Sequence, residues 1–213
     1  MRRLVPVVCV AAFLLGSPLS AQDNYRKHNL TVTAGAGLPR GDLSDVFANS
    51  FGAGFSYHYR FLPYLAAEAG YESMFGAARV RDYLPTSFGS FRIRDYQQFF
   101  PFGGRVIMPL LNDRIQVFGS GGGAYFRYSE RVRQPFGNYG YRLDCPVCAV
   151  RDGFGYYAGV GANFALDQGQ HFRLGFIGKV YRGGTAGDPF GDVPGHSTVD
   201  RWITLSGSFG FSF

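Results

Sequence analysis

Apolar and polar residues alternate with a period of two along most of the chain after residue 28. Strict alternation predicts half-buried β-strands, because successive side chains of a strand point to opposite faces. The pattern predicts eight strands, at residues 29–38, 51–61, 65–72, 100–108, 115–128, 154–164, 172–180 and 203–213. In the Gly-rich fifth segment, the pattern does not decide which residues share a face.

The predicted connections alternate between short and long. The short ones lie at 62–63, 109–113 and 166–170, and the long ones lie at 39–50, 74–96, 129–153 and 183–200. An even number of strands of about ten residues with this rhythm is typical of a transmembrane β-barrel. We therefore expect an all-β fold, an eight-stranded antiparallel up-and-down transmembrane β-barrel. The N-terminus and the short turns would face the periplasm, and the long loops would face outward.

The composition of the two strand faces indicates which one meets lipid. One face carries Phe, Tyr, Leu, Val and Ala, and the other carries mostly Gly, Ser, Thr and Asn with few charges. A soluble ligand-carrying barrel needs a charged outer face, so the apolar face is expected outside, in lipid. Aromatic residues near the strand ends are expected to form two interfacial girdles. These residues are Phe51, Tyr59, Phe61, Tyr64, Tyr71, Phe100, Phe172, Trp202, Phe211 and Phe213.

Composition and charge narrow the class of protein. Charged residues make up 17% of the chain, against roughly 25% in ordinary soluble domains. No apolar run reaches the roughly 18 residues of a membrane-spanning helix. The longest apolar run spans residues 4–15. Arg2 and Arg3 precede it, and the small residue Ala21 lies a few residues after its end. This pattern predicts a secretory signal peptide at 1–21 and an outer-membrane β-barrel domain at 22–213.

Cleavage after Ala21 would remove two arginines and lower the formal net charge from +6 to +4. No Lys/Arg-rich run follows, so nucleic acid is not an expected partner.

The last strand, which ends in Phe209-Gly-Phe211-Ser-Phe213, together with the alternation and the loop rhythm, resembles the small outer-membrane barrels of the OmpA transmembrane-domain and OmpX kind. The resemblance covers essentially the whole predicted mature chain. It implies export to the outer membrane of a Gram-negative cell and contact with outer-membrane lipid and lipopolysaccharide. It also implies that Phe209, Phe211 and Phe213 form the signal for the barrel-assembly machinery. A fold does not name an activity, so the role of the protein stays open at this point.

Seven ionisable residues are expected to face the lumen and form a polar network. They are His58, Arg60, Glu68, Glu72, Arg105, Arg173 and Lys179. Unpaired charges in a narrow barrel are costly, so each is expected to have a partner. Glu68 and Arg105 should lie nearly level on neighbouring strands, and Glu72 and Lys179 should pair higher in the lumen. Our hypothesis is a closed polar plug, and the alternative is charge satisfaction without any role in gating.

Cys145 and Cys148 form a C-x-x-C motif in the third long loop. No helix pattern follows to lower a thiol pKa, and zinc would need two more ligands that the nearby sequence does not supply. In an exported protein, a tight loop disulfide or a pair of unreactive thiols is therefore the expected state. No metal or other cofactor is expected.

Catalytic motifs are sparse. His196 and Ser197, with Asp192 and Asp200 nearby, form the one suggestive cluster, and no G-x-S-x-G motif occurs. We therefore expect a non-enzymatic protein with a structural or loop-mediated role, such as envelope integrity or adhesion. A small channel and an acyl hydrolase or transferase acting on outer-membrane lipids are the two alternatives.

The long loops are rich in arginine, and loops commonly carry binding functions. Arginines at the outer rim can pair bidentately with lipopolysaccharide phosphates, although a solvated charged face is the alternative. An extracellular ligand for the loops is therefore a further possibility. The arginines concerned are Arg79, Arg81, Arg92, Arg94, Arg131, Arg133, Arg142 and Arg151.

Overall fold

The computed structural model describes residues 25–41, 43–76, 83–86, 89–132, 149–187 and 197–213. The predicted signal peptide, the Cys145–Cys148 motif and His196 lie outside these residues. The strands are β1 (His28–Pro39), β2 (Ser50–Leu62), β3 (Leu65–Phe75), β4 (Tyr83–Thr86), β5 (Gly89–Leu110), β6 (Ile115–Val132), β7 (Ala149–Ala165), β8 (Phe172–Ala186) and β9 (Ser197–Ser212). One helical turn, α2 (Leu43–Val46), lies between β1 and β2.

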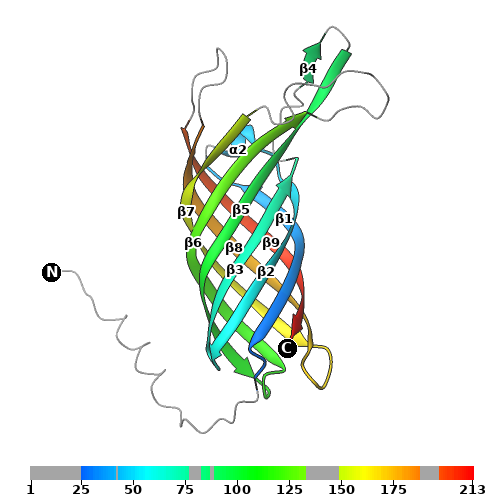
Figure 1. Cartoon of the computed structure of the whole chain (residues 1–213), viewed down its shortest axis with the longest axis vertical. Coiled ribbons are helices and arrows are strands. Elements are labelled where there is room, and N and C mark those ends of the chain that lie inside the picture. Colours follow the sequence, from blue (N-terminus) through cyan, green and yellow to red (C-terminus); the bar gives the residue numbers. More distant parts are fainter. Residues whose placement is uncertain (1–24, 42, 77–82, 87–88, 133–148, 188–196) are drawn as a thin grey trace, which may run out of the picture.

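Eight of the strands form a closed antiparallel barrel, which confirms the predicted fold (Figure 1). Each barrel strand pairs with its neighbours in sequence, and β1 pairs with β9 to close the cylinder. β3 pairs directly with β5, because the short strand β4 pairs only with β5 and stands beyond the cylinder. Within the described residues, no helix is long and apolar enough to cross a membrane.

The two ends of the barrel differ. The turns β2–β3, β5–β6 and β7–β8 lie at one end, together with the C-terminus, and this is called the short-turn end (Figure 1). Asp167 organises the β7–β8 turn, because its carboxylate accepts the backbone N–H groups of Phe172 and His171 at 2.9 and 3.1 Å. These hydrogen bonds hold the pKa of Asp167 below its ordinary value, and the one from Phe172 has the largest effect. The opposite end, which carries α2 and β4, is called the long-loop end.

The two faces are arranged as the alternation predicts. Large apolar side chains such as Phe55, Phe176 and Phe209 are exposed on the outside. Charged residues such as Glu68 and Lys179 are buried inside. The structure also settles the orientation of β6, whose even-numbered residues, including Phe118 and Phe126, face the lumen and are buried.

Several strands continue beyond their predicted ends on the long-loop side, so the predicted loop boundaries were wrong there. β5 begins at Gly89, β7 begins at Ala149 and β8 ends at Ala186. Strands therefore include Arg151, Asp152 and Asp200, which were expected in loops, and residues 183–186 of the predicted loop 183–200. These extensions contain few apolar residues in alternation, so the backbone ladder continues there without a clear pattern in the sequence.

Trp202 was wrongly assigned to the aromatic girdles. It is 0% exposed and lies among aromatic side chains inside the barrel. Its even number places it on the same face of β9 as Thr204 and Ser208, which are also buried. The other girdle residues keep the outward side of their strands; Phe51, for example, is 60% exposed.

Candidate functional site: a filled barrel lumen

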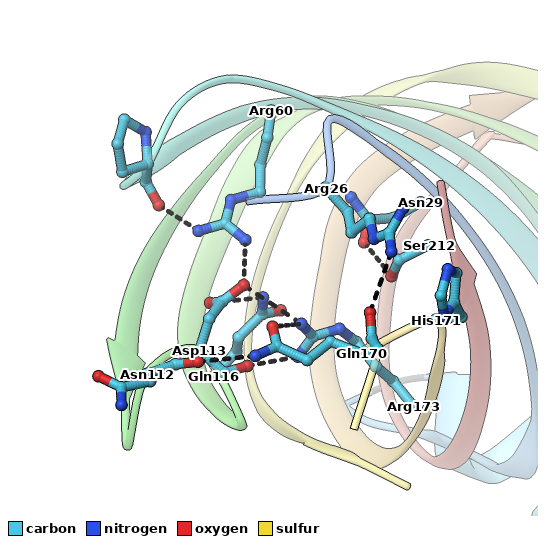
Figure 2. A network of polar contacts seen from close by, with 12 residues as sticks. Arg26, Asn29, Arg60, Asn112, Asp113, Gln116, Gln170, His171, Arg173 and Ser212 are labelled. Carbon is cyan, nitrogen blue, oxygen red and sulfur yellow. Dashed lines mark hydrogen bonds and ion pairs between the residues drawn. The ribbon is translucent and has the colours of Figure 1, made fainter. Parts of the chain in front are cut away.

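Asp113 closes the lumen at the short-turn end by bridging two arginines. It lies in the β5–β6 turn, where Leu111, Asn112 and Asp113 all adopt positive φ angles of 51–65°. This turn brings the Asp113 carboxylate under the barrel, as Figure 2 shows. Its Oδ2 atom accepts from Arg60 at 2.8 Å and from Arg173 at 3.2 Å. One turn residue thereby links β2 and β8, two strands that are far apart in the sequence.

Glu68 and Glu72 form two further ion pairs in the middle of the lumen. Arg105 Nε donates to Glu68 Oε2 at 2.8 Å, and the Tyr157 hydroxyl donates to Glu68 Oε1 at 2.7 Å. Lys179 Nζ donates to Glu72 Oε1 at 2.5 Å, and His58 Nε2 lies 3.6 Å from Glu68 Oε2. All of these side chains are nearly inaccessible to solvent. The carboxylates therefore compensate the buried positive charges at short range.

An aromatic layer lies above these ion pairs, toward the long-loop end. The rings of Phe99 and Tyr181 stack with centroids 4.3 Å apart. Phe126 meets Phe99 edge-on at 5.3 Å, and Trp202 lies 6.0 Å from Phe99. All four side chains are completely buried. The layer combines apolar burial with the offset and edge-to-face geometries that aromatic rings prefer.

Glycines on two neighbouring strands make room for the rings. Gly155 of β7 and Gly183 of β8 are directly paired. A Cβ atom at either position would lie only 2.6 or 2.7 Å from Cε2 of Phe126. The inward glycines therefore leave space for aromatic rings. The lumen is filled by these rings and does not contain small residues alone.

The first loop covers the aromatic layer. Phe47, directly after α2, is 3% exposed, and its ring lies 5.4 Å from that of Tyr128 and 5.8 Å from that of Trp202. Leu43 of α2 is buried in the same cluster. The loop thus contributes two apolar side chains to the lumen.

A final polar group lies near the long-loop end. Asp200 accepts hydrogen bonds from Thr185 and Thr198, each at 2.8 Å. The Arg151 guanidinium lies 4.6 Å from the centre of the Tyr128 ring. Arg151 and Asp200 are therefore engaged inside the barrel, although the sequence placed them in loops.

The filled lumen leaves little free space among the described residues. A cavity of about 20 Å³ near the short-turn end is lined by His58, Arg60, Arg105, Gln116 and Arg173, among others. A volume of this size holds about one water molecule. The described part of the lumen therefore contains ion pairs, a small cavity and an aromatic layer.

All seven residues expected in the polar network lie in the lumen. The structure joins Arg105 to Glu68 and Lys179 to Glu72, and it joins Arg60 and Arg173 to the same aspartate. The sequence analysis missed Asp113, because a turn residue has no alternation to reveal its direction. It also missed the aromatic layer, although Tyr157 and Trp202 occupy inward positions in the alternation and could have been recognised from it.

Chemistry beyond charge pairing has little support in the described part of the chain. No group of three or more His, Cys, Asp or Glu side chains is placed there to hold a metal ion. Of the suggestive His196 cluster, Ser197 and Asp200 are described. The Asp200 carboxylate is engaged by threonines.

Comparison with known proteins identifies the fold. No protein-family model matches the chain, and no curated protein matches it either. Among solved structures, the barrel is similar to the Neisserial surface protein A, with 13% identity, a TM-score of 0.57, and coverage of 87% of this chain and 97% of that one. It is also similar to the outer membrane protein OprG from Pseudomonas aeruginosa, with 11% identity, a TM-score of 0.51, and coverage of 89% and 98%. The chain therefore has the fold of the small eight-stranded outer-membrane β-barrels.

Proposed function

We propose that this chain is a non-enzymatic, closed β-barrel of the Gram-negative outer membrane. Its role is structural or is carried by its extracellular loops, in envelope integrity or adhesion. The partners proposed for it are outer-membrane lipid and lipopolysaccharide, the barrel-assembly machinery during biogenesis, and an extracellular ligand at the loops. The apolar outer face supports the membrane placement, because lipid solvates such a surface and water does not.

The aromatic layer is the observation that best supports a closed barrel. Phe99, Phe126, Tyr181 and Trp202 are completely buried across the lumen, and Phe47 covers them from the first loop. Below them, the ion pairs of Glu68 and Glu72 cross between strands. An ion that passes through would have to displace both the rings and the paired charges, which favours a closed barrel over the channel alternative.

Conductance across a planar lipid bilayer tests this proposal. The refolded full-length protein is expected to show no large steady current at moderate voltage. A compact gel band that shifts on boiling, taken from the same vesicles, establishes that the folded barrel is present. A large, steady single-channel conductance would overturn the closed barrel.

Lipid turnover tests the enzymatic alternative. Labelled phospholipid and lipid A are incubated with the folded protein and with the His196→Ala variant. Neither protein is expected to generate products. Product formation that depends on His196 would replace the structural proposal by a lipid-modifying enzyme.

A further inference from the structure

Three arginines lie side by side on the outer wall, and we call them the arginine row. Arg182 of β8 and Arg201 of β9 are directly paired across the strands. Arg40 follows β1, and its backbone N–H donates to the carbonyl of Arg201 at 2.9 Å. Neighbouring strands are about 4.8 Å apart, so the three Cα atoms lie within about 10 Å. All three side chains are exposed.

The arginine row has no acidic partner among the described residues. The ion pairs found there involve Asp113, Glu68, Glu72 and Asp167, and none of these reaches the row. Like charges directly opposite each other on neighbouring strands are destabilising. A bound anion would relieve this repulsion.

On β1, β8 and β9 the row lies near the upper edge of the apolar band, and Val199 is the next outward residue of β9 beyond it. The next outward residues toward the short-turn end are Leu38, Ile203 and Val180, which form the adjacent cross-strand row. From Ile203 to Phe213, β9 presents apolar residues or glycine outward at every second position. At about 3.3 Å per residue and a tilt near 40°, that stretch spans about 25 Å along the barrel axis, the height of a typical lipid-facing band. The arginines therefore lie at the depth of lipid headgroups.

Below the adjacent row of Leu38, Ile203 and Val180, the outer wall carries several small side chains. Outward positions below it include Ala36 and Ala34 of β1, Gly178 of β8 and Gly207 of β9. A Cβ atom at Gly207 would meet no atom nearer than 3.9 Å. An acyl chain that passes this apolar row can therefore approach the backbone closely at Gly207, and dispersion contacts grow as that distance shortens.

We propose that the arginine row is a binding site for the phosphate headgroup of an outer-leaflet lipid, whose acyl chains lie along these small residues. Guanidinium groups bind phosphate oxygens bidentately, and three exposed arginines at neighbouring backbone positions suit a phosphorylated sugar headgroup. This inference rests on the proposed outer-membrane placement and names the lipid contact at a defined position on the barrel.

Native mass spectrometry of the full-length barrel in detergent micelles tests the site, with titration of diphosphoryl lipid A. Arg201→Gln removes the central charge, and we expect it to weaken lipid A binding about tenfold, as loss of a charged hydrogen-bonding pair would. Arg201→Lys keeps the charge but loses the planar fork, so its affinity should fall between the two. The matched control is Arg114→Gln, because Arg114 is also exposed but lies at the short-turn end. Its affinity should equal that of the unchanged protein.

Two further ligands identify what is recognised. Dephosphorylated lipid A is expected to bind weakly and equally to all variants, and inorganic phosphate alone is expected to bind far more weakly than lipid A. Equal lipid A affinity in Arg201→Gln and Arg114→Gln would overturn the site, and so would full-strength binding of the dephosphorylated lipid. Free phosphate that binds as tightly as lipid A would overturn the role of the lipid. The compact unboiled band is recorded for each variant, so failure of the site is distinguished from failure of the barrel itself.

Discussion

At the scale of single residues, the barrel interior depends on charges that have short-range partners. The Lys179–Glu72 pair joins β8 to β3 across the lumen, and both side chains are buried. A buried pair contributes little net stability compared with apolar side chains of similar size, whereas one buried charge without its partner is strongly destabilising. Loss of either charge would therefore leave the other buried without a partner.

Lys179→Met is expected to lower the free energy of unfolding by about 3 kcal/mol, because it leaves the Glu72 carboxylate buried without its cation. The double variant Lys179→Met/Glu72→Met should recover most of that loss, since it removes both charges. Urea unfolding of the refolded barrel measures this by the fluorescence of Trp202, the single tryptophan, which lies in the lumen. A double variant that loses the sum of both single losses would contradict the coupling.

At the scale of elements, α2 and the residue after it connect the first loop to the lumen. The loop contributes Leu43 and Phe47 to the aromatic cluster, although α2 itself is only a four-residue turn. Helices this short have little stability of their own. The buried side chains therefore stabilise this part of the loop.

Phe47→Ala is expected to destabilise the barrel by about 2 kcal/mol, less than a deep core truncation because Phe47 lies at the rim of the cluster. It should also make the first loop more sensitive to protease in intact vesicles. The matched control is Phe51→Ala, because Phe51 is an outward residue of β2 with 60% exposure and no place in the lumen. Equal protease sensitivity in the two variants would contradict the anchoring role of Phe47.

The elements also show how far the sequence could predict this molecule. The alternation predicted the eight strands and the faces of all of them except β6, because the outer wall is apolar wherever it meets lipid. It did not predict the strand extensions such as 89–96 of β5, because only two apolar residues, Phe91 and Ile93, alternate with polar ones there. The seven polar lumen residues were predicted from their alternate positions along the strands alone. Asp113 did not, because its position depends on three consecutive positive φ angles that no apolar pattern encodes.

At the scale of the whole molecule, the first and last strands close the cylinder. The backbone N–H of Phe213 donates to the carbonyl of His28 at 2.8 Å, and that of His28 donates to the carbonyl of Phe213 at 3.0 Å. The His28 and Phe213 rings stack with centroids 5.2 Å apart. Backbone pairing accounts for closure, and pairing does not require a particular side chain at position 213. The exposed Phe213 side chain is therefore available for a second role, that of the proposed assembly signal.

Phe213→Ser separates these two roles. Because the backbone pairing with His28 remains, refolding into detergent should give the same compact band as the unchanged protein. If Phe213 is read by the assembly machinery, the folded yield in the outer membrane of cells should fall severalfold. Phe172→Ser is the matched control, since Phe172 is an exposed aromatic residue at the same end and, like Phe213, lies beside Phe211, with ring centroids 5.4 and 5.6 Å away. A similar fall in cellular yield for both variants would assign the effect to loss of lipid-facing aromatic surface, and an unchanged yield for Phe213→Ser would remove Phe213 from the signal.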